Sequence, residues 1–178
     1  MEITLRQETT DDYSKISSAI VAAYENVEYS NHREQIMVER LRKSQAFIPE
    51  LSIVATDKDN LIMGHILLTR IHIYKQEACY EALALAPLSI RPEYQNKGIG
   101  KRLVLESHRV AKELGFEYIA VLGHAQYYPK FGYTITSNYN IEIPFEISKA
   151  NSMIISLSGS SFSEIIGGRI EYSNEFFE

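Results

Sequence analysis

The spacing of apolar residues predicts a short strand and two helices at the beginning of the chain. Residues Met1–Leu5 alternate between apolar and polar side chains, as in a strand. The next segment carries apolar side chains at helical spacing: Tyr13, Ile16, Ile20, Ala23 and Tyr24. Thr9 and the acidic residues Asp11 and Asp12 are suited to the N-terminus of that helix. A second helix is predicted at His32–Lys43, and we expect both helices to pack apolar faces into a core.

Strand patterns dominate the middle of the chain. Leu51–Thr56 and Leu61–Tyr74 are strand-like runs, and the polar cluster Asp57–Asn60 between them predicts the turn of a hairpin. Tyr80–Ile90 predicts a further strand that Pro87 interrupts. Because proline cannot donate a hydrogen bond to a sheet, it marks an edge or a bulge.

The second half predicts one long helix followed by short elements. Gly98–Leu114 has an amphipathic helical pattern, and Gly115 is suited to end it. The predicted strands are Phe116–Leu122, Ile141–Ile147, Ser152–Leu157 and Arg169–Tyr172, and Gln126–Phe131 is a short helix or turn. The 178 residues therefore predict a single domain (1–178) of the α/β (α+β) class, with a largely antiparallel central sheet flanked by helices.

Composition narrows the classes of partner. The chain has 18 basic and 23 acidic residues and a net charge of −5, which argues against nucleic acid as the main partner. Cys79 is the one cysteine, so an internal disulfide and a cysteine-rich metal site are excluded. His65 and His72 lie at odd spacing on a predicted strand, which argues against a shared metal. No apolar run approaches the ~20 residues of a membrane span. We therefore expect a cytoplasmic protein with no metal, membrane or nucleic-acid partner.

The segment QNKGIG, Gln95–Gly100, connects a predicted strand to the long helix. A helix N-terminus presents unpaired backbone N–H groups and the positive end of the helix dipole, so it favours an anion, above all a phosphate. The two glycines let a bulky anion reach the backbone. The cations Lys97, Lys101 and Arg102 oppose the dipole unless an anion is bound. From these residues alone, a phosphate site and an ordinary loop with solvated lysines are equally consistent.

Two nucleotide-binding motifs are excluded by single residues. A Walker A loop requires Ser or Thr where Arg102 stands, and a Rossmann fingerprint requires glycine where Leu103 stands. The pattern Gln-x-x-Gly-x-Gly between a strand and a helix resembles the acetyl-CoA pyrophosphate loop of the GNAT superfamily of N-acetyltransferases. The segment GHAQYYPKFGY, 123–133, is similar to the family's aromatic signature. The tail GGRIEYSNEFF resembles the YhbS-like branch of the family, whereas residues 1–50 match only in the order of elements.

The resemblance implies a GNAT-type mixed sheet, acetyl-CoA as co-substrate and direct transfer of acetyl to a primary amine in a ternary complex. In this fold the strand before the pyrophosphate loop splays from its neighbour and leaves a slot for the pantetheine arm. The residues that the resemblance assigns to the cofactor are Leu88, Ser89, Ile90, Gln95, Asn96, Lys97, Gly98, Ile99, Gly100, Lys101 and Tyr128. The acceptor amine, a small molecule or a peptide, is not identified by the sequence.

Catalytic roles follow from the same resemblance. It places Tyr128 near the cofactor sulfur, where a phenol could protonate the departing thiolate. Since neighbours on a helix point about 100° apart, we expect only one of Tyr127 and Tyr128 to face the slot. Glu81, on the strand before the bulge, is a candidate base for the amine. His124 could also be a base, but we favour a packing or capping role because an isolated histidine is a weak signal.

Other functions remain open at this stage. The chain could bind acyl-CoA without catalysis, as a sensor or regulatory protein, or it could transfer a longer acyl group. By analogy with the fold, an exposed strand near the C-terminus could supply a homodimer interface.

Overall fold

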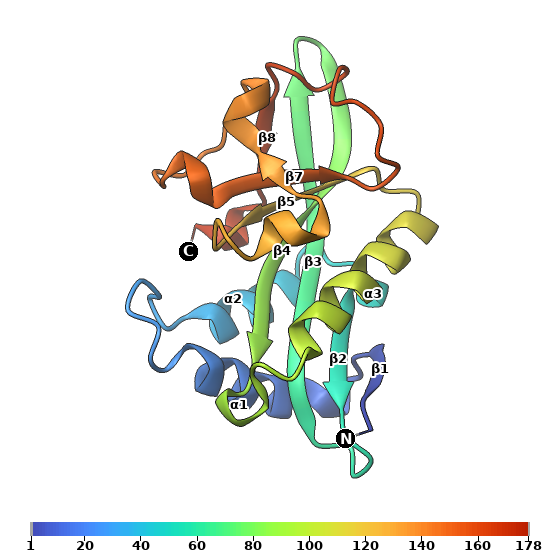
Figure 1. Cartoon of the computed structure of the whole chain (residues 1–178), viewed down its shortest axis with the longest axis vertical. Helices are drawn as coiled ribbons and strands as arrows, with labels where there is room; N and C mark the ends of the chain where they lie inside the picture. The colour runs from blue at the N-terminus through green and yellow to red at the C-terminus, as the bar shows by residue number, and fades with distance from the viewer. Residues whose placement is uncertain (1, 178) are drawn as a thin grey trace.

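One eight-stranded sheet runs through the molecule in a computed structural model that describes residues 2–177 (Figure 1). The strand order is β1-β2-β3-β4-β5-β7-β6, with β8 added to β3. The strands are β1 (Thr4–Gln7), β2 (Ser52–Thr56), β3 (Ile62–Lys75), β4 (Ala78–Ile90), β5 (Tyr118–Leu122), β6 (Thr134–Ile135), β7 (Ser152–Ser156) and β8 (Arg169–Glu171). The helices are α1 (Tyr13–Tyr24), α2 (Glu34–Arg42) and α3 (Ile99–Glu113). Strands β4 and β5 run parallel and the other pairs antiparallel, so the predicted mixed, largely antiparallel sheet is confirmed.

Helices cover both faces of the sheet because the strand side chains alternate between two cores. In β2, Ile53 packs in the same cluster as Leu103 of α3. Its neighbour Val54 packs in the cluster that contains Ile16 of α1 and Leu41 of α2. Successive residues of a strand point to opposite faces, so α3 lies on one side of the sheet and the α1–α2 pair on the other (Figure 1).

The start of α1 follows from the predicted capping residues. A 3-10 turn (Thr10–Asp12) precedes the helix, and Thr9 and Asp12 form a capping box around it. The Asp12 carboxylate also pairs with Arg6 of β1 at 2.6 Å. Hydrogen bonds from Arg6 and Thr9 hold the pKa of Asp12 far below its usual range. This contact ties the first strand to the first helix.

A buried polar cluster joins β1, α2 and β3. The Glu8 carboxylate accepts hydrogen bonds from Nε and Nη2 of Arg42 at 2.9 and 2.8 Å. Nε2 of His65 lies 3.5 Å from the same carboxylate and 2.9 Å from the Ser52 hydroxyl. His65 therefore belongs to a structural cluster. Residues 2–177 contain no group of three His, Cys, Asp or Glu side chains placed to hold a metal ion.

Strand β4 changes register at Pro87 and then separates from β5. In its pairing with β3, Leu85 faces Leu68 and Leu88 faces Ile66, so β4 accommodates one extra residue at the proline. The predicted bulge is confirmed. Pairing of β4 with β5 ends at Leu85, and the last residues of β4 leave its neighbour.

One prediction for the last third of the chain is wrong. Ile141–Ile147 is not a strand, since it contributes one bridge, from Glu142 to Arg169. Ile141, Ile143 and Phe145 do pack into a core, but Pro144 lacks a backbone donor for a ladder. Strand β8 pairs with β3, and the homodimer interface at a C-terminal strand stays a prediction. Strand β6 was not predicted.

Candidate functional site

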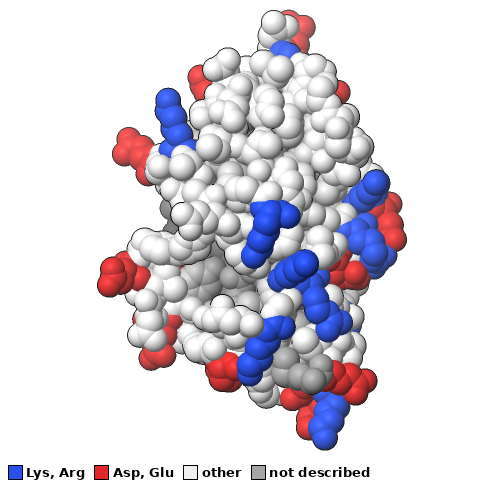
Figure 2. Space-filling model, viewed as in Figure 1, with Lys and Arg blue, Asp and Glu red and all other residues white. Residues whose placement is uncertain are grey.

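A cavity of about 710 Å³, hereafter the cleft, lies where β4 and β5 separate. One wall comes from α1 and the segment after it, and the opposite wall from residues 94–101 and 122–130. The end of β4 forms the floor between them. Figure 2 shows the hollow in the middle of this face, with lysine and arginine side chains along one side of it.

The predicted anion-binding corner opens into the cleft. Gln95, Asn96 and the first turn of α3 (99–101) line it. Gly98 precedes the helix with φ +78°, a left-handed conformation that favours glycine. The Gln95 amide donates to the carbonyl of Ile90 at 3.1 Å, which fixes the loop onto the end of β4. Unpaired N–H groups of the helix start therefore point toward the space beside the splayed strand.

The cations of this corner do not all face the cleft. Lys101 lines it, whereas Nζ of Lys97 donates to the carbonyl of Glu93 at 2.7 Å. Arg102 donates to the carbonyl of Ile3 at 3.0 Å. Lys130, which the sequence analysis did not single out, lines the cleft from the segment after β5. Positive charge thus reaches the cleft from two separate segments.

Both tyrosines of the aromatic signature line the cleft, so the prediction that only one would do so is wrong. Their rings meet edge to face at 5.1 Å. Tyr127 reaches to the start of α3, where a Cβ on Gly100 would lie 2.7 Å from its hydroxyl oxygen. Gly100 therefore makes room for a side chain of the protein itself.

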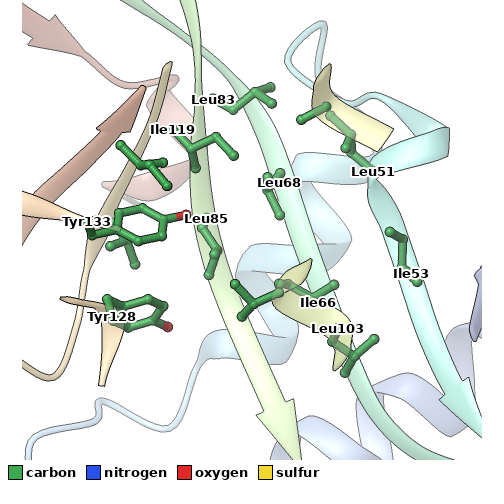
Figure 3. Packing of buried hydrophobic residues seen from close by; sticks show 14 of the residues in the cluster. Leu51, Ile53, Ile66, Leu68, Leu83, Leu85, Leu103, Ile119, Tyr128 and Tyr133 are labelled. Atoms are coloured by element: carbon green, nitrogen blue, oxygen red, sulfur yellow. The ribbon is translucent and has the colours of Figure 1, made fainter. Parts of the chain in front are cut away.

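Tyr128 is 7% exposed and forms the inner wall. Figure 3 shows its ring beside that of Tyr133, both turned toward β4 near Leu85. A Cβ on Gly123 would lie 2.4 Å from the Tyr128 ring, so this approach requires glycine. Burial raises the pKa of Tyr128 far above its ordinary value, and the phenol keeps its proton. The described residues offer its hydroxyl no hydrogen bond, which leaves the group available to a ligand.

The backbone at the end of β4 faces the cleft through alternate residues. Leu88 and Ile90 line it, while Ser89 between them is 1% exposed and points to the other side. The Tyr24 hydroxyl, from α1, donates to the carbonyl of Leu88 at 3.3 Å. Burial raises the pKa of Tyr24 well above its ordinary value. Tyr24 was predicted only as part of a core stripe, and no signal in the sequence indicated that the last turn of α1 reaches the cleft.

Tyr29 and His124 meet across the two walls. The Tyr29 hydroxyl lies 2.6 Å from Nε2 of His124, and the rings are T-shaped with centroids 5.6 Å apart. Both residues line the cleft and both are exposed. His124 therefore lines the cleft and packs against Tyr29, and its role as a base or as a packing residue stays a prediction.

Glu81 lies away from the cleft. Its side chain is 59% exposed and pairs with Arg70 at 3.1 Å. Leu88 lies seven positions further along β4. In an extended strand, this spacing places the two residues about 23 Å apart. The structure does not bring this candidate base to the site. Among the described residues that line the cleft, none is Asp or Glu.

Comparisons with known proteins give one consistent family. Residues 49–135 match the model of the acetyltransferase (GNAT) domain. The chain is 35% identical to the uncharacterized N-acetyltransferase YjhQ of Escherichia coli K12 over 101 residues, 57% of this chain and 55% of YjhQ. It is 21% identical to the uncharacterized N-acetyltransferase YhbS of the same strain over 126 residues, 71% of this chain and 74% of YhbS. The match therefore spans about half the length of YjhQ.

Two solved structures share the fold over the whole chain. The GNAT family N-acetyltransferase YhbS from Escherichia coli, in complex with CoA, superposes with a TM-score of 0.88 at 20% identity and covers 100% of this chain and 93% of its own. A GNAT family acetyltransferase from Brucella melitensis, in complex with acetyl-CoA, has a TM-score of 0.79 at 26% identity, with 98% of each chain covered.

Proposed function

We propose that the chain is an acetyltransferase of the GNAT family, whose domain model residues 49–135 match, and that it transfers the acetyl group of acetyl-CoA to a primary amine within a ternary complex. The observation that carries the proposal is the opening of the first turn of α3 into a cleft beside the splayed end of β4. A helix start favours the pyrophosphate, and exposed strand backbone favours the pantetheine arm. The bound cofactors of the two solved relatives support this choice of donor.

Each proposed contact uses a group that lines the cleft. The backbone of 96–101 would bind the pyrophosphate, with Lys101 and Lys130 supplying positive charge from two segments of the same wall. The pantetheine arm would lie along Leu88–Ile90, and the backbone N–H near Leu88 would polarise the thioester carbonyl. Lys97 would contribute through its backbone, because its side chain is hydrogen-bonded to Glu93.

In the transfer step, the amine nitrogen bonds to the thioester carbon and the carbon–sulfur bond breaks. Tyr128 would donate its proton to the departing thiolate, since burial keeps the hydroxyl protonated until that step, and the proton released by the amine would then restore the phenol. The amine must lose a proton to attack. His124 replaces Glu81 as the proposed acceptor of that proton, since its imidazole lines the cleft and Glu81 does not. The products are the acetylated amine and CoA.

Calorimetric titration with acetyl-CoA at moderate salt tests the donor site. We expect one molecule bound per chain, with binding weakened about fivefold or more in Lys101→Ala and Lys130→Ala. Lys15→Ala is the matched control, because it removes the same charge from an exposed position of α1 that does not line the cleft. Absence of binding at millimolar acetyl-CoA would contradict the proposal.

Release of free CoA with a panel of primary amines tests catalysis. Amine-dependent release is the expected result. Saturable acetyl-CoA binding without release for any amine would instead support a non-catalytic sensor that binds acyl-CoA. Comparison of acetyl-CoA with longer acyl donors then defines the acyl group.

A further inference from the structure

The side chains of Tyr29 and His124 form a hydrogen-bonded pair inside the cleft. The Tyr29 hydroxyl oxygen lies 2.6 Å from Nε2 of His124, and both side chains line the cleft. A neutral imidazole carries hydrogen on one ring nitrogen and accepts at the other. When the phenol donates to Nε2, the hydrogen of the ring is on Nδ1, and Nε2 is the one basic nitrogen. A proton from a ligand in the cleft then reaches that nitrogen by way of the Tyr29 oxygen.

The Tyr29 phenol also lies near the groups that the transfer step uses. Burial raises the pKa of Tyr24 and of Tyr128, and the Tyr29 phenol adds electrostatically to both shifts. Tyr24 contacts the carbonyl of Leu88 on the cleft floor, and Tyr128 is the proposed acid. The Tyr29 hydroxyl is therefore near both His124 and the part of the cleft where the thioester would react.

The other phenols of the cleft are less suited to receive a proton. The Tyr24 hydroxyl donates to the carbonyl of Leu88 at 3.3 Å, and the Tyr127 hydroxyl reaches the start of α3. The Tyr128 hydroxyl has no hydrogen-bond partner among residues 2–177. Of the described tyrosines that line the cleft, only Tyr29 has its hydroxyl against a nitrogen base.

We propose that Tyr29 is a further catalytic residue, which takes the proton of the attacking amine while its own proton passes to Nε2 of His124. The inference rests on the proposed function. One amine N–H bond and the Tyr29 O–H bond break, a new Tyr29 O–H bond and an Nε2–H bond form, and His124 becomes an imidazolium. Tyr29 ends the step as a neutral phenol, so the transfer needs no phenolate at this position. The imidazolium proton later restores the Tyr128 phenol, once Tyr128 has protonated the thiolate.

Steady-state kinetics with the most active of a panel of alkyl and aryl primary amines test this proton relay. We expect Tyr29→Phe and His124→Gln each to lower kcat about 100-fold, a size typical of general acid–base catalysis. The double variant should lose no more than either single variant, because the two residues act as one unit. A rise in KM with kcat unchanged in Tyr29→Phe would mean that the contact only holds the walls together, and would overturn the relay.

Tyr74→Phe and His72→Gln are the matched controls for these variants. Their rings lie 6.2 Å apart on β3, and neither residue lines the cleft. Each change removes the same chemical group as its counterpart in the cleft. Both controls should keep kcat within about twofold of the wild-type value. A 100-fold loss in the controls as well would overturn the assignment to Tyr29 and His124.

Nitrogen NMR of isotope-labelled histidine tests the pair without any acceptor. The relay requires hydrogen on Nδ1 of His124 and a bare Nε2 that accepts from Tyr29. We expect the signal that is lost in His124→Gln to have this form, and its Nε2 resonance to shift in Tyr29→Phe. Hydrogen on Nε2 would mean that the phenol accepts instead of donating, and it would overturn the relay while acetyl-CoA binding and turnover remain. If acetyl-CoA does not bind, or no amine releases CoA, the proposed function fails, and the relay fails with it.

Discussion

The hydroxyl of Tyr29 lies 2.6 Å from Nε2 of His124, and this contact joins the segment between α1 and α2 to the residues that follow β5. It crosses the cleft rather than supporting either wall from behind. Because Tyr29 is 76% exposed, few other contacts hold its ring in place. The contact therefore controls how closely the first wall of the cleft approaches the second.

Removing the Tyr29 hydroxyl tests this arrangement. We expect Tyr29→Phe to raise KM for the amine about three- to tenfold, since the first wall loses its attachment, and to leave acetyl-CoA affinity within about twofold. Steady-state kinetics with a varied amine and calorimetry with acetyl-CoA give the two values. Tyr74→Phe, at the far end of β3, is the control. A larger loss in acetyl-CoA affinity than in KM would show that the contact serves the donor site.

Tyr128→Phe tests the proposed acid. We expect kcat to fall roughly 100-fold while acetyl-CoA binding and thermal stability change little, because the hydroxyl has no partner among the described residues. Tyr133→Phe is the contrasting variant, since the Tyr133 hydroxyl lies 2.9 Å from Nε2 of His108 inside the core. That change should lower stability and leave kcat nearly unchanged. Full turnover in Tyr128→Phe would reject the assignment.

A double-mutant cycle tests the contact between Gly100 and Tyr127. Gly100→Ala places a Cβ 2.7 Å from the Tyr127 hydroxyl oxygen, so we expect acetyl-CoA binding to weaken about tenfold as the helix start shifts. Tyr127→Phe removes that oxygen and should restore part of the loss. Gly98→Ala is the matched control, because its Cβ would meet nothing within 4 Å and its strain comes from φ +78°. Calorimetry should find no rescue of Gly98→Ala by Tyr127→Phe.

The buried Glu8–Arg42 pair predicts a large effect on stability. Arg42→Met leaves the Glu8 carboxylate without its two strongest donors in a buried site, and we expect a loss of about 3–5 kcal/mol in the free energy of unfolding. Arg109→Met removes an arginine that pairs with Glu106 and Glu113 on the exposed face of α3 and should change stability little. Urea denaturation of both variants makes the comparison. Similar losses in the two would contradict the structural role of the buried cluster.

The lowered pKa of His108 predicts that stability decreases as the pH is lowered through a defined window. Burial lowers the pKa of His108 from its ordinary value of 6.5 to about 4. Between these values the unfolded chain binds a proton that the folded chain does not, so the contribution of His108 to the free energy of unfolding decreases as pH falls from 6.5 to 4 and then stays constant. We expect His108→Gln to reduce this slope, by a total on the order of 1–2 kcal/mol because the ring is only partly buried. His65, Glu8 and Asp12, whose pKa values are also lowered, contribute to the slope that remains. An unchanged slope between pH 5 and 6.5 in the variant would contradict the assignment.

Periodicity predicted most of the fold because most elements here bury one clear face. The strand-like run Leu61–Tyr74 and the helical spacing at Gly98–Leu114 correspond to β3 and α3 within one or two residues. Ile141–Ile147 shows the limit of the method. Its alternation reports burial of apolar side chains on a core, and that burial does not require a strand when the backbone meets only one partner.

The candidate site was predictable where a local motif carries it. Gln95–Gly100 lies at the helix start as expected, since glycine and strand–helix order are local properties. The first wall, from α1 and the segment after it, was not predictable, because Tyr24 and Tyr29 reach the cleft only through the packing of α1 against the sheet. For the same reason Glu81, chosen from its strand alone, lies at the wrong end of β4.

The two walls of the cleft come from separable stretches of the chain. The stretch matched by the family domain, 49–135, holds the anion-binding corner and the aromatic segment but not Tyr24 or Tyr29. Substitutions in the first two helices and the segment between them would therefore reshape one wall of the cleft without changing any residue of the other. In the proposed function, the first wall would set which amine enters, and the second would hold the acetyl donor.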